Sequence, residues 1–197
     1  QGTESLQAVT AGHLHDFMPE VVILLRTGCA HHFADAATRG HDRLVEQTTG
    51  LGAEAIFETV AAYYKHENQT RGLPFPFVFL VLPLVFHKRT VSAIKSRAGA
   101  GAMRKALRAD REISIGLQQR MESMSETTLA ACSLALDSGL MLYDSETAQL
   151  IPTRASLSQI RHDSDAVSDI RAAAKRVGVS FSELSLAEIS TLLEVVF

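Results

Sequence analysis

The chain has 197 residues, of which 46% are hydrophobic, and a formal net charge of −3 at pH 7. This length and apolar fraction fit one domain that buries a core, or one domain with an extension. The same balance excludes a long disordered tail and a generally basic nucleic-acid binder. The two cysteines, Cys29 and Cys132, form no CxxC motif, so we expect no disulfide framework and a reducing, cytoplasmic setting. No charged segment with a small-residue cleavage site precedes an apolar run, so we expect no signal peptide.

Residues 1–47 are predicted to form a helical extension. In EVVILLRTGCAHHFADAATRG, residues 20–40, apolar residues recur at helical spacing, and Gly40 is expected to end the helix. The segment is rich in histidine, but His31 and His32 are adjacent and so point to different sides of a helix. No HExxH motif or paired Cys/His spacing accompanies them, so we expect no metal site.

Residues 48–197 are predicted to form the core domain, which begins with an amphipathic helix over 51–72. Ile56 and Val60 lie on its apolar face, and Lys65 follows near its negative C-terminal end. Gly72 is expected just beyond the point where the helix stops.

The next stretch, GLPFPFVFLVLPLVFHKRT at 72–90, is apolar from Leu73 to Phe86. This run is shorter than the roughly 20 residues that cross a bilayer, so we expect an element buried on all sides rather than a membrane span. Pro74 and Pro76 suit the first turn of a helix, and Pro83 argues against a central strand. We therefore predict a buried helix over 78–86, kinked at Pro83, with a buried strand as the alternative.

A basic segment runs from His87 to Arg111. It contains eight lysine or arginine residues and a single acidic residue, Asp110. They are the candidate contact residues Lys88, Arg89, Lys95, Arg97, Arg104, Lys105, Arg108 and Arg111. Within the segment, RAGAGAMRK (97–105) predicts a mobile loop that enters a short helix, and it lacks the GK[ST] of a phosphate-binding P-loop. We expect the cations to contact DNA phosphates or an acidic partner surface, with a merely solvated loop as the alternative.

A helix, a second helix and a tight hairpin are predicted next. Residues 113–124 have helical spacing, and SETTLAACSLALDSG, 125–139, predicts a helix with Ser125 as N-cap and Gly139 at its end. Two short extended runs then flank the turn DSET, which predicts a hairpin near 139–152. The fold class is therefore mainly α, a helical domain with a winged helix-turn-helix-like unit. The alternative is a hairpin that only covers the core.

Two helices are expected to close the chain. DSDAVSDIRAAAKRVG, 163–178, begins at the cap Asp163 and is expected to stop at Gly178. SLAEISTLLEVVF, 185–197, opens with Ser185 and Glu188 at capping-box spacing. Its last residues are too apolar to stay in water, so they pack on the domain or dock on a partner.

No residue set predicts catalysis. The chain contains no GxSxG elbow and no Gly-rich dinucleotide fingerprint. Cys29 and Cys132 lie on predicted inner faces, where cysteine is usually a small buried hydrophobe. We therefore expect no catalytic residues, no cofactor and no metal.

Several blocks resemble the middle component of three-component ABC systems. AAYYKHENQTRG followed by GLPFPFVFLVLPLVFHKRT is similar to that family's most recognisable segment, of the type GLP-[apolar]-FLVLPLVLHKxTR. SETTLAACSLALDSGLMLYD, AAAKRVG and SFSELSLAEISTLLEVVF extend the resemblance over 50–197, so residues 1–47 lie outside it. The basic segment is richer in cations, glycine and alanine than the family's compact segment.

The resemblance implies a non-enzymatic adaptor in bacterial antiphage or antiplasmid defence of the Lamassu type. Such a subunit would bridge an SMC-like ABC ATPase to an effector, often a nuclease. It would contact DNA through the complex, and we expect no membrane partner. The alternative is a freestanding winged-helix DNA-binding regulator, which predicts tight and salt-sensitive DNA binding. We also expect Phe79 in the core, where Phe79→Asp would unfold the protein.

Overall fold

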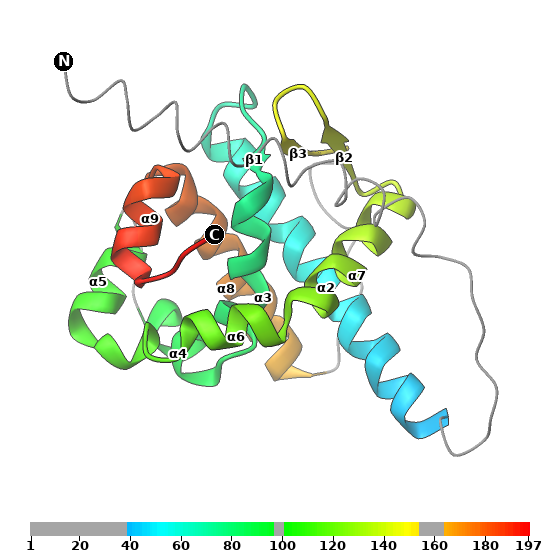
Figure 1. The fold of residues 1–197 in the computed structure, drawn as a ribbon, viewed down its shortest axis with the longest axis horizontal. Coiled ribbons are helices and arrows are strands. Elements are labelled where there is room, and N and C mark those ends of the chain that lie inside the picture. Colours follow the sequence, from blue (N-terminus) through cyan, green and yellow to red (C-terminus); the bar gives the residue numbers. More distant parts are fainter. Residues whose placement is uncertain (1–38, 97–100, 154–163) are drawn as a thin grey trace. The chain divides into compact units, whose positions relative to one another are not determined.

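The computed structural model describes residues 39–96, 101–153 and 164–197, with only the backbone described at 39–47 and Ala102 (Figure 1). These residues form eight α-helices and one small sheet, which confirms the mainly α fold class. The helix predicted over 20–40 lies outside the described residues, apart from its last two positions.

Helix α2 (Arg39–His66) starts earlier and ends sooner than predicted. It includes Gly40, so the prediction that this glycine ends a helix was wrong. It also runs through the expected boundary at 47/48. The backbone contacts group Gly40–Phe197 into one unit, and the assignment of 1–47 as a separate extension stays a prediction.

The end of α2 lies before Gly72 because Asn68 and Gln69 adopt left-handed conformations, with φ of 53° and 63°. Gly72 has another role. A Cβ atom there would lie 2.6 Å from the carbonyl oxygen of Leu150, so the glycine lets the chain pass close to the hairpin.

The apolar run forms three consecutive elements: strand β1 (Leu73–Pro74), the 3-10 helix η1 (Phe75–Phe77) and helix α3 (Val78–Val85). The predicted buried helix around Pro83 is confirmed. Helices α4, α6, α7 and α8 all pack against α3, which is therefore the centre of the core. Phe79 is an exception to the burial, because it is only half-buried and meets Phe75 edge to face at 5.9 Å. Phe79 was expected in the core, but it lies at the edge of the core and is not fully buried.

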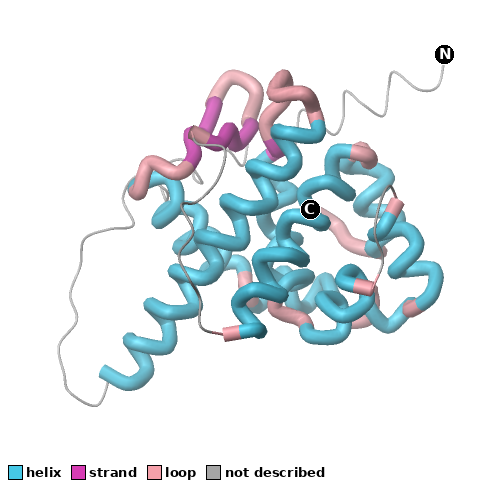
Figure 2. The backbone as a smooth tube through the Cα atoms, turned by 180° about the vertical axis from the view of Figure 1, so that it is seen from behind, coloured by secondary structure: helices cyan, strands magenta, loops and turns pink. Residues whose placement is uncertain are grey.

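The expected hairpin is present as β2 (Met141–Asp144) and β3 (Gln149–Pro152). Strand β1 adds to it in the order β1-β3-β2, with both pairings antiparallel. The three strands lie at one end of the helical unit in both views (Figures 1 and 2). Met141 and Leu150 face the core, whereas Leu142 is 60% exposed.

Helices α6 (Leu117–Ser123) and α7 (Ser125–Asp137) precede the hairpin, and the short 3-10 helix η2 (Arg111–Ile113) precedes α6. Ser125 is not the N-cap of α7, as predicted, but its first helical residue. Its hydroxyl donates back to the carbonyl of Glu122 at 2.8 Å, so it bonds to the end of α6 instead of capping α7.

Helix α8 (Asp165–Ser182) continues past Gly178, so the predicted stop at this glycine was wrong. Gly178 lies where α8 crosses α2, and a Cβ atom there would be 2.2 Å from the carbonyl oxygen of Thr59. Beside this crossing, Arg171 donates to the buried carboxylate of Glu58 at 2.7 Å. The predicted cap Asp163 lies outside the described residues.

Helix α9 (Leu186–Leu193) begins with the predicted capping box of Ser185 and Glu188. The apolar tail that follows is divided: Val195 is buried, whereas Val196 is 76% exposed. The Phe197 ring lies 6.5 Å from the Phe77 ring, centre to centre. The tail therefore packs partly on the domain and leaves an apolar end in solvent.

No single helix among the described residues is long and apolar enough to cross a membrane. One pair of helices, Phe75–Val85 with Lys88–Lys95, passes on length and composition, but it is bent by 97°.

Candidate functional site

The basic segment contains two helices, α4 (Lys88–Lys95) and α5 (Ala102–Ala109). The short helix predicted to follow the Gly/Ala-rich stretch is present as α5, whereas α4 was not predicted. Val91 and Ile94 are the buried apolar side of α4, and Met103 and Leu107 are buried on α5. This spacing of three and four residues is an ordinary helical signal that the cation content of the segment masked. Residues 97–100, including the candidate Arg97, lie outside the described residues.

Three of the candidate cations pair with acids of the same domain. Arg89 donates to Asp110, with Nε 2.6 Å from Oδ2, and also to Glu112. Lys95 meets Asp169 of α8 at 2.5 Å, and Arg104 meets Glu188 of α9 at 3.1 Å. The side chains are about half exposed, so each pair adds little stability. The position of α4 and α5 is therefore set mainly by their buried apolar residues, and the ion pairs leave these three cations matched within the domain.

The other four described candidates are Lys88, Lys105, Arg108 and Arg111. All are exposed, and no ion pair to any of them occurs within the described parts of the chain. Lys105 and Arg108 are one helical turn apart on the outer side of α5. We call these four residues the unpaired cations. That they contact a partner or DNA stays a prediction.

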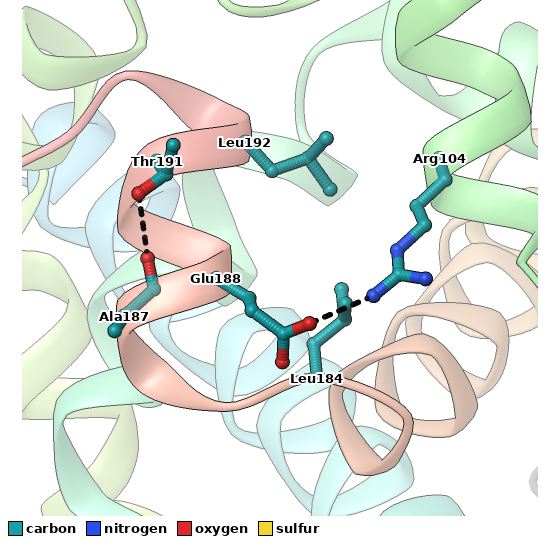
Figure 3. Close-up of a pocket in the computed structure, with 6 residues that line it drawn as sticks. All are labelled: Arg104, Leu184, Ala187, Glu188, Thr191 and Leu192. Carbon is teal, nitrogen blue, oxygen red and sulfur yellow. Dashed lines mark hydrogen bonds and ion pairs between the residues drawn. The ribbon is translucent and has the colours of Figure 1, made fainter. Parts of the chain in front are cut away.

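An open pocket of about 380 Å³ lies between α5 and α9 (Figure 3). Arg104 extends from α5 toward Glu188 of α9, and the side chains of Leu184 and Leu192 point into the space between them (Figure 3). Ala187 and Thr191 complete the lining. The sequence pointed to Arg104, to the helix cap Glu188 and, through the apolar run LLEVVF at 192–197, to Leu192, but it gave no sign of Leu184 or of the pocket itself.

The polar groups of the pocket already have partners. The Glu188 carboxylate accepts hydrogen bonds from the backbone amide and hydroxyl of Ser185, at 2.8 and 2.9 Å. These bonds, with a smaller contribution from Arg104, hold the pKa of Glu188 below its usual value. The Thr191 hydroxyl donates to the carbonyl of Ala187 at 2.9 Å. What the pocket offers a ligand is therefore mainly apolar contact.

The predicted winged unit has the opposite charge to α5. From Met121 to Thr153 the chain contains no lysine or arginine and five acids. These are Glu122, Glu126, Asp137, Asp144 and Glu146. All except Asp144 are exposed. The Thr147 hydroxyl and the Glu146 amide lower the pKa of Asp144, which keeps the turn of the hairpin negative. An acidic surface of this kind repels phosphate.

The described residues show no arrangement typical of catalysis. Cys132 is buried, and its burial raises the pKa of its thiol to about 12. A thiol in this state is not a nucleophile at neutral pH. Within the described ranges, no group of three or more His, Cys, Asp or Glu residues gathers where a metal ion could be held.

The family of the chain follows from its match to a known family model. Residues 49–197 match the model described as ABC-three component (ABC-3C) system Middle Component 3. No curated protein and no solved structure matches the chain. The matched range contains most of α2, the central helix α3, the basic helices and the α5–α9 pocket. The chain therefore belongs to the middle component 3 family of ABC-three component systems.

Proposed function

We propose that this middle component is a non-enzymatic adaptor in the cytoplasm. It bridges an SMC-like ABC ATPase to an effector, a nuclease, in a bacterial antiphage or antiplasmid defence complex of the Lamassu type. The observation that carries the proposal is the family membership over 49–197, because a middle component belongs to a system with further components.

The surface of the domain supports a binding role. Arg89, Lys95 and Arg104 are matched by acids of the same chain, whereas the unpaired cations face solvent. These unpaired cations therefore remain available to an acidic partner surface or to DNA phosphates, which they attract over several ångströms.

The test is co-expression of the chain, carrying an affinity tag, with the other components of its system. We expect the ATPase and the effector to be recovered together with the tagged chain. In a matched expression that lacks this chain, the ATPase and the effector should no longer associate. Recovery of the chain alone, or an ATPase–effector complex that forms without it, would contradict the adaptor role.

A winged-helix DNA-binding regulator is the second candidate. Its support is that α7 leads directly into the β2–β3 hairpin and that β1 completes the sheet. A helix that reads DNA approaches phosphates on both sides of the major groove, which favours lysine and arginine. The charged residues of helix α7 and of the hairpin are all acidic, so this candidate is weaker than the adaptor.

The regulator can be tested with the isolated chain and a labelled DNA duplex. The adaptor predicts weak binding at physiological salt. Binding that is tight and falls steeply as the salt concentration rises would favour the regulator instead.

A further inference from the structure

We propose that the pocket between α5 and α9 binds an acidic, amphipathic segment of a partner protein. One large apolar side chain of that segment enters the pocket, and its carboxylates meet Lys105 and Arg108 outside it. The inference rests on the proposed adaptor function and names the chemistry of one partner contact.

The apolar half of this recognition comes from α9 and the turn before it. Leu184 and Leu192 point into the pocket (Figure 3), and Ala187 of α9 is among the residues that line it. A pocket of about 380 Å³ has room for a large side chain, and its open form suits an anchor on a longer segment. Because Arg104, Glu188 and Thr191 already bond within the domain, a polar ligand would find few free partners here.

The charged half of the recognition comes from α5. Arg108 lies one turn along α5 from Arg104 and so on the same side of the helix, near the pocket wall that Arg104 forms. Lys105 follows Arg104 directly and is turned by about 100° from it, toward the outer side of α5. Arg104 is matched by Glu188, but Lys105 and Arg108 have no acid partner among the described residues. The Glu188 carboxylate of α9 already accepts hydrogen bonds from Ser185 and from Arg104. The outer wall is therefore positive, and charge complementarity selects an acidic segment.

Nucleic acid fits this pocket less well than protein. Proteins that bind single strands stack the bases on aromatic side chains beside a basic groove. The residues that line the pocket include no aromatic side chain. The leucines of the pocket, with the cations of α5 beside them, instead favour an apolar side chain that is flanked by carboxylates.

The first experiment places a photo-crosslinking amino acid at Thr191 in the tagged full-length chain. Thr191 lines the pocket and is exposed, so the change leaves the core intact. The chain is co-expressed with the other components, irradiated, and the crosslinked peptide is identified by mass spectrometry. We expect a peptide of the ATPase or the effector that combines a large apolar residue with aspartate or glutamate. Crosslinking to nucleic acid, or no crosslink within an intact complex, would overturn the inference.

The second experiment uses two variants of one position, Ala187→Glu and Ala187→Lys. Ala187 is exposed in the first turn of α9, where a glutamate is favoured by the helix dipole, so the fold should be retained. The glutamate should repel an acidic segment and weaken retention of its partner by about tenfold, while the lysine should not weaken it. Equal retention by both variants, or loss only with lysine, would overturn the inference.

These outcomes separate the inference from the proposed function. If the unmodified chain assembles with the other components but neither the crosslink nor the Ala187 variants behave as expected, the adaptor stands and the pocket is not its contact. If the unmodified chain does not assemble at all, the adaptor fails and the inference fails with it.

Discussion

Gly178→Ala should destabilise the protein, although alanine is the better helix former. Helix α8 crosses α2 at Gly178, and the added Cβ atom would lie 2.2 Å from the carbonyl oxygen of Thr59 and 3.0 Å from the Cβ atom of Ala62. Ordinary van der Waals contact begins at 3.4 Å. The clash is with backbone, which cannot turn away as a flexible side chain would. The two helices would therefore have to separate by about 1 Å.

The magnitude is the difference between two opposing effects. Overpacking of a well-packed core costs about 1–3 kcal/mol, and a backbone clash belongs at the upper end of that range. Alanine recovers about 1 kcal/mol of helix propensity over glycine. The net loss in the free energy of unfolding is thus about 2 kcal/mol, or about 4–8 °C in melting temperature for a protein of this size.

Thermal unfolding followed by circular dichroism, with urea unfolding at 25 °C, measures this loss. Gly50→Ala is the matched control, because Gly50 lies in α2 and an added Cβ atom there would meet nothing within 4 Å. The control should stabilise the protein by up to about 1 kcal/mol. If Gly178→Ala were as stable as Gly50→Ala, the close α2–α8 crossing would be refuted.

Three further outcomes are expected. Leu82→Asp should abolish folding, because Leu82 is fully buried in α3 and an unpaired charge there is not tolerated. Phe79→Asp should lower the melting temperature but leave more folded protein than Leu82→Asp, because Phe79 is partly exposed and the introduced carboxylate can reach water; circular dichroism and gel filtration distinguish the two. The double variant Lys105→Glu/Arg108→Glu should change the free energy of unfolding by less than about 0.5 kcal/mol, because both side chains are exposed. It should nevertheless weaken assembly with the partner, and normal assembly in a pulldown would count against a role for α5. Ser185→Ala should lower the melting temperature at pH 7, and it should lower it less near about pH 3. The hydrogen bonds from Ser185 lower the pKa of Glu188, so the stability that they contribute is lost as the pH falls below the ordinary pKa of glutamate; an equal effect at both pH values would contradict this.

The elements that the sequence predicts well are those whose cause is local. The run from Leu73 to Phe86 is apolar on every side, which only a buried element can satisfy, and α3 is the central helix of the core. The capping box of Ser185 and Glu188 is read directly from its spacing and is present in α9. The hairpin follows from the turn DSET between two short apolar runs.

Two of the errors concern glycines, whose effect depends on what lies beside them. Gly40 and Gly178 were both predicted to end helices, and both lie inside one. Glycine costs a helix about 1 kcal/mol, which packing against a neighbour can offset. At Gly178 that neighbour is the backbone of α2, 119 positions earlier at Thr59. No local pattern contains this contact.

The candidate site shows the same division between composition and placement. The sequence by itself determined that α4 and α5 would be basic in a chain of net charge −3, because charge follows directly from residue type. Only the tertiary structure decided which cations are matched, since the acids that pair with Lys95 and Arg104 come from α8 and α9. It alone also brought Leu184 and Leu192 to the side of α5 and so formed the pocket. Periodicity reports which side of a helix is apolar, but a pocket depends on the distance between two helices, and that distance is set by the packing of the whole core.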